Sequence, residues 1–268
     1  MRWLWPSLVV VWASVLAMPG ARAAEVDLNL VLAVDVSGSI ELDEAELQRK
    51  GFAEAFRDPR VIRAIQGGKT RRIAVTYVEW AGSHYTRLGV DWRVIDSPET
   101  SNAFADDLQI LAFNSARWTS ISGAIEYGVQ RLRESPHRAP REVIDISGDG
   151  ANNNGEYVTN ARDRAVKKGI TINGLPIVNA RPSPYGTPQL PNLDWYFEDC
   201  VIGGPDAFIV VANGFEDFAR AIRRKLIREI ADPGGSRWET SVLLPAASPH
   251  RPPCDAGEKI IKDLIDDT

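Results

Sequence analysis

Residues 26–34 read VDLNLVLAV, and the five residues that follow, 35–39, read DVSGS. The first run becomes continuously apolar toward its end, which is typical of a strand that is buried on both faces of a sheet. The second run is polar, with a carboxylate at Asp35 and hydroxyls at Ser37 and Ser39. Because functional groups of parallel α/β sheets lie beyond the carboxyl ends of the strands, this stretch predicts both the fold and the place of a site.

The sequence that follows alternates between strand-like and helix-like segments, which predicts one α/β domain over residues 24–231. Such alternation produces a doubly wound, mostly parallel central sheet with helices on both faces, a Rossmann-like arrangement. One edge strand is expected to be antiparallel, because only a short turn separates the strand-like segments 72–80 and 85–95. The other predicted strands are 142–147, 170–178 and 207–212, and the predicted helices are 43–57, 98–113, 120–133, 155–168 and 214–231.

The two ends of the chain are expected to lie outside this domain. Residues 1–23 combine an arginine, an apolar run and small residues before position 24, which is the pattern of a secretory signal peptide. If the signal peptide is cleaved, we expect a secreted or periplasmic protein. The alternative is that residues 1–23 remain as an uncleaved N-terminal anchor. Residues 232–268 are predicted to form a Pro-rich linker and a short tail, with one amphipathic helix within 254–268.

Composition excludes several classes of protein. The chain has 268 residues with 31 Lys and Arg against 36 Asp and Glu, a net charge of −5 without a basic cluster, so we expect no nucleic-acid partner. No apolar run after residue 25 approaches the ~20 residues that a membrane span needs. The two cysteines, Cys200 and Cys254, cannot form a zinc ribbon. In an exported protein we expect them to form a disulfide, and two lone thiols are the alternative.

Two further polar segments follow predicted strands or open predicted helices. Thr119 directly precedes the helix predicted from residue 120, and Asp149 lies between two glycines after the strand 142–147. With the first segment they supply carboxylates and hydroxyls, and oxygen ligands of this kind suit a hard cation such as Mg²⁺ or Ca²⁺ rather than zinc. The sequence therefore predicts a metal site formed by Asp35, Ser37, Ser39, Thr119 and Asp149.

The order Asp35-x-Ser37-x-Ser39, Thr119, Asp149-Gly150 resembles the metal-ion-dependent adhesion site (MIDAS) of von Willebrand factor type A (vWA) domains. The resemblance covers about residues 26–231. It implies that the three hydroxyls are direct ligands of Mg²⁺, or of Ca²⁺ or Mn²⁺, and that the two carboxylates bind directly or through water. It also implies a protein partner whose exposed Asp or Glu completes the coordination.

Longer stretches of the chain, 73–80, 143–150 and 201–208, are similar to a bacterial family of secreted vWA-like proteins of unknown function. One position departs from the vWA pattern, because Trp118 stands where many vWA domains have Gly before the Thr. A bulky ring at that position is expected either to narrow the approach to the ion or to stack on a partner.

From these residues we expect an exported, divalent-cation-dependent binding module rather than an enzyme. No His lies in the motif segments, and Ser37 and Ser39 would be used as ligands, so neither a general base nor a nucleophile is apparent. The alternatives are a metal-dependent hydrolase that uses the same ion and a metal-free structural domain of the cell envelope.

Three other features have two interpretations each. Asp145 lies inside an apolar strand, so it is expected either to be protonated or to pair with a backbone or hydroxyl group of a neighbouring segment. The run Asn152–Asn154 is expected to be a solvated loop that caps the next helix, and a role in shaping the metal site is the alternative. The irregular stretch 179–205 follows a predicted strand, so it is expected at the same edge of the sheet as the predicted metal site. There it either sets binding specificity or covers the sheet edge.

Overall fold

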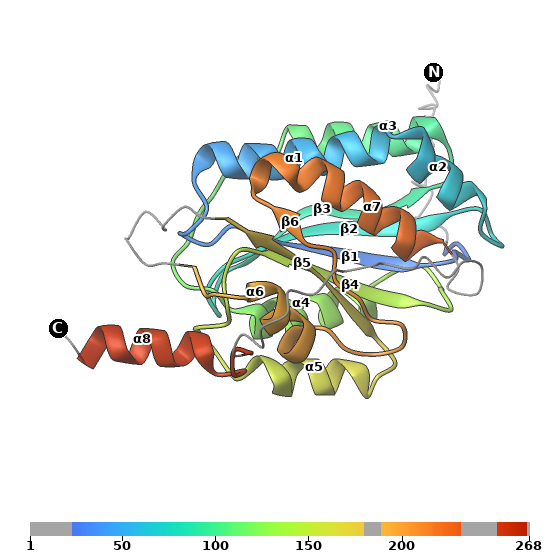
Figure 1. Cartoon of the computed structure of the whole chain (residues 1–268). Helices are drawn as coiled ribbons and strands as arrows, with labels where there is room; N and C mark the ends of the chain where they lie inside the picture. The colour runs from blue at the N-terminus through green and yellow to red at the C-terminus, as the bar shows by residue number, and fades with distance from the viewer. Residues whose placement is uncertain (1–22, 180–188, 232–250, 267–268) are drawn as a thin grey trace, which may run out of the picture.

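The computed structural model of the chain describes residues 23–179, 189–231 and 251–266 (Figure 1). Within them a six-stranded sheet has the order β3-β2-β1-β4-β5-β6, in which only the edge strand β3 is antiparallel to its neighbour. This arrangement confirms the predicted doubly wound, mixed sheet. The strands are β1 (Asn29–Asp35), β2 (Ile73–Trp80), β3 (Thr86–Ile95), β4 (Glu142–Gly148), β5 (Thr171–Val178) and β6 (Ala212–Asn213).

Helices cover both faces of the sheet (Figure 1). One layer contains α1 (Leu42–Arg57), α2 (Pro59–Gln66), α3 (Pro98–Gln109) and α7 (Phe218–Ile230), which a short 3₁₀ turn (Phe215–Asp217) precedes. The other contains α4 (Ile121–Arg133), α5 (Val158–Val166), α6 (Leu193–Tyr196) and a π-helical turn (Phe197–Val201).

Strand β1 is the central element that both helix layers share. Its successive side chains alternate between the two hydrophobic clusters, with Leu30 and Leu32 facing one layer and Val31 and Ala33 facing the other. All four are fully buried, as the continuously apolar sequence predicted. This burial holds the end of β1 in place at the edge of the sheet where the polar run begins.

Three elements differ from the sequence-based expectation. Helix α2 was not predicted; it begins because Asp58 caps it, accepting a hydrogen bond from the Arg60 amide at 2.8 Å, with Pro59 in its first turn. The predicted strand 207–212 is wrong for most of its length, since β6 contains only its last residue and Asn213. The short helical turns at 193–201 lie inside the stretch expected to be irregular.

Asp145 on β4 has a different partner from the one that the sequence suggested. It is 2% exposed, and one carboxylate oxygen lies 2.6 Å from Nζ of Lys225, a fully buried lysine of α7. Glu229, one turn further along α7, lies 3.4 Å from the same ammonium and accepts a hydrogen bond from Asn173 of β5. The partner is therefore a buried cation rather than a backbone or hydroxyl group, and the cluster ties α7 to the sheet.

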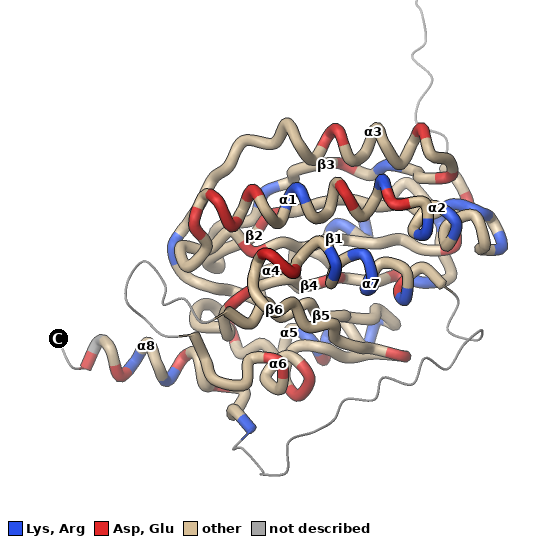
Figure 2. The backbone as a smooth tube through the Cα atoms, turned by 45° about the horizontal axis from the view of Figure 1, so that its top comes forward, with Lys and Arg blue, Asp and Glu red and all other residues tan. Residues whose placement is uncertain are grey.

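Charged side chains are distributed unevenly over this frame. Lys and Arg gather around α2 and α7, whereas carboxylates mark the first turns of α1 and the region of α6 (Figure 2). No helix among the described residues is long and apolar enough to cross a membrane.

A C-terminal segment, residues 251–266, returns to the domain. Cys254 forms a disulfide with Cys200, which confirms the expected bridge, and a helix, α8 (Ala256–Asp266), follows. Helix α8 begins against the body and extends away from the sheet (Figure 1). Residues 1–22 and 232–250 lie outside the described residues, and with them almost all of the predicted signal peptide and most of the predicted linker.

Candidate metal site

The three polar segments that the sequence singled out meet at the carboxyl ends of β1 and β4. The hydroxyl oxygens of Ser37 and Ser39 lie 3.0 Å apart, and the Ser39 hydroxyl donates a hydrogen bond of 2.8 Å to Oδ1 of Asp149. Asp35 lies at the end of β1 and Asp149 directly after β4, and these strands are neighbours in the sheet. Residues 110 positions apart therefore share one small polar cluster.

Asp35 is the deepest residue of the cluster. Its Oδ1 accepts a hydrogen bond of 2.7 Å from the Ser37 amide, but its Oδ2 is buried and has no hydrogen-bond partner. The backbone of Gly148 packs closely against this oxygen, because a Cβ at that position would lie 2.9 Å from Oδ2. A buried carboxylate oxygen without a partner is costly unless a cation or a proton satisfies it.

Thr119 faces the cluster from the segment that leads into α4. It is 6% exposed, and its hydroxyl lies beside Gly150, where a Cβ would be 3.6 Å from Thr119 Oγ1. Two hydrogen bonds of 2.8 Å fix its backbone: its amide donates to the side chain of Asn153, and its carbonyl accepts from the Asn153 amide. These bonds attach Thr119 to the loop that follows Asp149.

Trp118 adopts a backbone conformation that few side chains tolerate. Its φ is +72°, in the left-handed region that favours glycine, which explains why Gly suits this position. The ring is 40% exposed, and the Arg117 guanidinium lies 5.6 Å from its centroid. The ring therefore stands on the surface next to Thr119.

The loop of three asparagines is part of the site's frame, so its interpretation as a solvated, helix-capping loop was wrong. Asn152 is completely buried and accepts a hydrogen bond of 3.0 Å from the Ser122 amide in the first turn of α4. Asn154 accepts one of 2.7 Å from the Ser83 amide after β2. Three consecutive asparagines, beginning three residues after the candidate ligand Asp149, were the signal that could have identified this role.

The electrostatics of the cluster favour a bound cation. Burial raises the pKa of Asp35 well above its usual value, and the charge of Asp149 raises it further. Burial also raises the pKa of Asp149 to about 6, with a further rise from Glu44 and a partial lowering by the Ser39 hydroxyl. Both shifts mean that two negative charges are unfavourable here without a positive partner.

The residues present fit a hard divalent cation. They offer only carboxylate and hydroxyl oxygens, the ligand set of Mg²⁺, Mn²⁺ and Ca²⁺. The unpartnered Oδ2 of Asp35 is the oxygen that such an ion would satisfy. Among the described residues no group of three or more His, Cys, Asp or Glu side chains is placed to hold a metal. The candidate site itself contributes two carboxylates, Asp35 and Asp149, and its other oxygens are hydroxyls.

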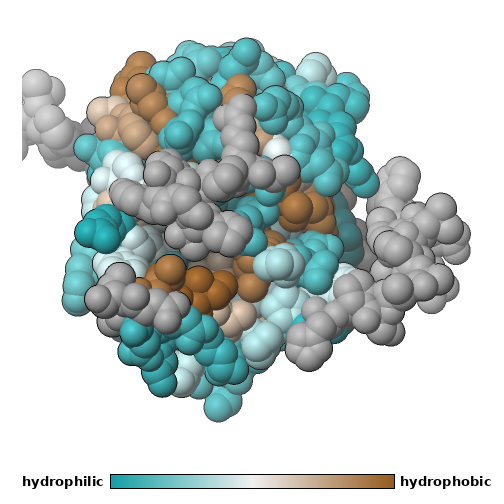
Figure 3. All heavy atoms as spheres, turned by 60° about the vertical axis from the view of Figure 1, so that its left-hand side comes forward, coloured by the Kyte–Doolittle hydropathy of each residue, from teal (hydrophilic) through white to brown (hydrophobic). Residues whose placement is uncertain are grey.

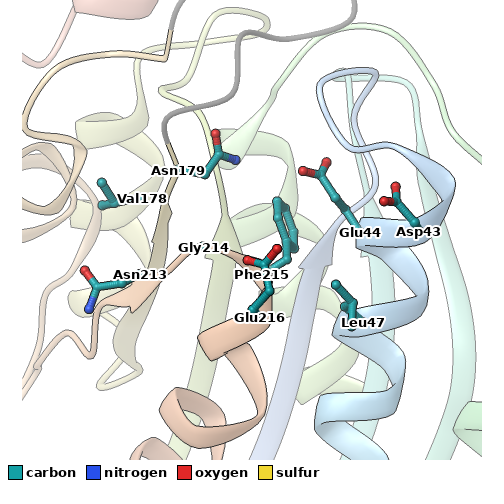
Figure 4. A pocket seen from close by; sticks show the side chains of 9 residues that line it. All are labelled: Asp43, Glu44, Leu47, Val178, Asn179, Asn213, Gly214, Phe215 and Glu216. Carbon is teal, nitrogen blue, oxygen red and sulfur yellow. The ribbon is translucent and has the colours of Figure 1, made fainter.

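A pocket of about 360 Å³ lies beside the cluster, and its walls come from the start of α1, the end of β5 and the connection from β6 to α7 (Figure 4). Glu44, whose charge acts on Asp149, forms part of its wall. The carboxylates in this wall add negative charge to the edge that carries the candidate site. The pocket is lined by Asp43, Glu44, Leu47, Val178, Asn179, Asn213, Gly214, Phe215 and Glu216.

The rest of this edge is largely hydrophilic, with separate apolar patches (Figure 3). Gln189 attaches the stretch after β5 to the edge, because its amide donates to the carbonyl oxygens of Asp149 and Ile177, each at 2.7 Å. Gln189, which belongs to the irregular stretch 179–205, thus lies at the same edge of the sheet as the candidate site, as expected. Residues 180–188, which include Tyr185, lie outside the described residues.

Comparison with known sequences places the chain in one family. Residues 25–234 match the family described as "Protein of unknown function (DUF1194)". No curated protein matches the chain.

Comparison with solved structures shows the same fold in several proteins. They include proximal thread matrix protein 1 from the mussel byssus (14% identity, TM-score 0.53, 77% of this chain and 49% of that one). The pilus adhesin SpaC from Lactobacillus rhamnosus GG has 14% identity and a TM-score of 0.54 over 78% of this chain and 32% of its own. A von Willebrand factor type A protein from Catenulispora acidiphila has 12% identity and a TM-score of 0.51 over 77% and 43%. The chain spans less than half the length of each, and the likeness identifies its fold as that of a vWA domain.

Proposed function

The chain belongs to the family of proteins of unknown function DUF1194, and on the basis of its vWA fold we propose that it is an exported protein-binding module that depends on a divalent cation. One observation carries this proposal. Asp35 is fully buried, its Oδ2 has no hydrogen-bond partner, and the charge of Asp149 acts on it. Such an oxygen is favourable only when it carries a proton or lies beside a cation.

The residues assigned to the cation are Ser37, Ser39 and Thr119 as direct ligands, with Asp35 and Asp149 bound directly or through water. Mg²⁺ is the ion that we expect, and Mn²⁺ or Ca²⁺ would use the same oxygens. A bound cation supplies an electrophilic centre for the carboxylate of a partner protein. Because hydroxyls neutralise little of the charge of the ion, the ion and the partner's Asp or Glu strengthen each other's binding.

The disulfide between Cys200 and Cys254 supports the proposal of export. Disulfides persist in oxidising compartments such as the periplasm and the extracellular space. The predicted signal peptide at residues 1–23 points to the same location. The name of one structural relative, a pilus adhesin, is consistent with a binding role outside the cell.

Calorimetric titration of the purified protein with Mg²⁺, Mn²⁺ and Ca²⁺ tests the first part of the proposal. At a free ion concentration of 100 times Kd, binding should add about 2.7 kcal/mol to the free energy of unfolding. Ser37→Ala should remove this stabilisation. Its own stability in EDTA, lowered by the loss of the hydrogen bond to Ser39, is the baseline for the comparison. Ser115→Ala, which removes an exposed hydroxyl from a nearby loop, is the matched control and should behave like the original protein.

Recovery of partners from a cell-envelope extract, with Mg²⁺ and again with EDTA, tests the second part. A partner that binds only with Mg²⁺ and is lost with Ser37→Ala supports the proposal. The absence of binding heat for all three cations would refute it. Unchanged partner recovery in EDTA would point instead to a metal-free structural domain.

A further inference from the structure

The C-terminal segment contacts the loop that holds Thr119. Glu258 in the first turn of α8 accepts a hydrogen bond of 2.7 Å from Nδ2 of Asn152, a residue 106 positions earlier. Asn152 is followed by Asn153, which binds both the amide and the carbonyl of Thr119. A continuous path of contacts therefore joins α8 to a candidate ligand of the ion.

The approach of α8 to this loop is close. The backbone of Gly257 lies directly on the carbonyl group of Asn152, so that a Cβ at this position would overlap the carbonyl oxygen. Gly257 and Ala256 are both buried, and Oε2 of Glu258 is buried without a hydrogen-bond partner. The first turn of α8 is therefore packed into the body even though the rest of the helix extends away from it (Figure 1).

Two interactions fix the segment just before this turn. The disulfide joins Cys254 to Cys200 in the π-helical turn on the helix layer of α4 and α5. Arg251 forms ion pairs with Glu198, at 2.9 Å, and with Asp199, which belong to the same turn. These contacts place Glu258 opposite Asn152 at little cost in chain entropy, because the tether is already closed.

Glu258 also selects the orientation of the Asn152 amide. A carboxylate can only accept, so it requires the NH₂ group of Asn152 to point toward α8. That NH₂ group also donates to the carbonyl of Glu156 at 3.0 Å, and the Oδ1 of Asn152 is then directed at the Ser122 amide. With Asn152 completely buried, a wrong orientation would leave donors facing donors.

We propose that residues 251–258, anchored by the Cys200–Cys254 disulfide, form a positioning element that holds the loop Asn152–Asn154, and through it Thr119, in the geometry of the ion site. The part of this inference that concerns ion affinity rests on the function proposed above. The part that concerns the position of the loop does not.

Hydrogen exchange in EDTA tests the structural link without any metal. The amides of Thr119 and Ser122 donate to the side chains of Asn153 and Asn152, so their exchange rates report on the loop directly. Glu258→Ala should accelerate exchange at both amides about tenfold, the value expected for the loss of a hydrogen bond to a charged group. Glu258→Gln keeps an acceptor oxygen and should restore slow exchange.

Titration with Mn²⁺ as the probe tests the consequence for the site. Glu258→Ala and the double variant Cys200→Ala/Cys254→Ala should each raise the Kd for Mn²⁺ at least about fivefold. This effect is smaller than the 10–100-fold rise that is typical when a residue that holds a ligand directly is replaced. Glu258→Gln should bind like the original protein. Asp263→Asn, which removes an exposed carboxylate further along α8, is the matched control.

Each outcome distinguishes between the two proposals. Unchanged exchange at Thr119 and Ser122 in Glu258→Ala overturns the positioning role. Faster exchange with an unchanged Kd for Mn²⁺ shows that the loop is held but that the ion does not depend on it, which also overturns the inference. If the original protein binds no cation, the proposed function fails while the exchange data still decide the structural link.

Discussion

The buried cluster of Asp145, Lys225 and Glu229 predicts that the stability of this protein falls as the pH rises. The cluster holds two carboxyl groups and one ammonium, all at most 2% exposed. Its neighbours include the uncharged Asn173 and Phe208 and one further cation, Arg141, which donates a hydrogen bond of 2.6 Å to the backbone carbonyl of Glu229. Burial raises the pKa of Asp145 to about 8, Lys225 lowers it in part, and the charge of Glu229 raises it again. Near neutral pH the folded protein therefore keeps a proton on Asp145 that the unfolded chain releases.

The sign and size of the effect follow from this proton. At pH values between 3.8, the ordinary pKa of an aspartate, and about 8, the pKa of Asp145 in the folded state, the folded protein binds one proton more than the unfolded chain. The free energy of unfolding then falls by up to about 1.4 kcal/mol for each pH unit, or about 3 kcal/mol between pH 5 and pH 7. This contribution is fully present below the unfolded pKa and is lost as the pH rises through the folded pKa.

Asp145→Asn removes the titrating group while keeping its shape and its hydrogen-bonding capacity. We expect the variant to lack this slope, so that its stability relative to the original protein increases by about 3 kcal/mol from pH 5 to pH 7. Urea unfolding of both proteins in EDTA at pH 5, 6 and 7 measures the difference. Asp35 and Asp149 lie outside this cluster, so their titration contributes equally to both proteins and cancels.

A control and a refuting result complete the design. Asp263→Asn changes an exposed aspartate of α8, and the stability of this variant should stay parallel to that of the original protein. Equal m-values are required for the comparison, because a change in m would mean a different unfolded or native state. If the stabilities of Asp145→Asn and the original protein run parallel from pH 5 to pH 7, Asp145 is ionised in the folded state and the reasoning is wrong.

Two other substitutions test the local geometry. Trp118→Gly relieves a φ of +72° and should raise the free energy of unfolding by about 1 kcal/mol in urea titration; a loss of stability would show that the exposed ring contributes more than the strain costs. Gly51→Ala would place a Cβ 2.7 Å from the Phe218 ring and 3.2 Å from the Ala219 backbone, so it should separate α1 from α7 and lower stability by about 1–3 kcal/mol. An unchanged urea midpoint would mean that this contact is not tight.

The parts of the fold that sequence predicts well are those in which one local pattern decides the outcome. The continuous apolar run of β1 occurs only where both faces are covered, and the short turn before β3 allows only an antiparallel pair. The stretch 207–212 shows the limit of this reasoning. Phe208 and Ala212 are buried, but residues 207–211 pair with β5 only around Gly174. The regular strand is therefore limited to Ala212 and Asn213, which pair with Ile177 and Val178.

In the candidate site, too, sequence reasoning reached the residues with a local pattern and missed those that depend on distant contacts. The sequence predicted five oxygen-bearing residues from their positions after a strand or before a helix, and their role as metal ligands stays a prediction. The sheet order β1-β4 explains why Asp35, Ser37, Ser39 and Asp149 lie together. The sequence could not identify what holds them. Asn152 depends on Glu258, a partner 106 residues away, and no local pattern reveals a contact of that separation.

Strand β4 also shows why the two groups of buried carboxylates differ. Asp145, inside the strand, contacts Lys225 and keeps its own proton near neutral pH, so the chain itself removes the need for an external cation there. Asp149, just after the strand, lies near Asp35, and among the described residues no Lys or Arg stabilises the charge of either one. The two groups should therefore respond differently to EDTA. The pairing of Asp145 should be unaffected, whereas Asp35 and Asp149 lose whatever external cation offsets their repulsion. The absence of a positively charged partner for Asp35 and Asp149 among the described residues supports the interpretation that these two carboxylates bind an ion.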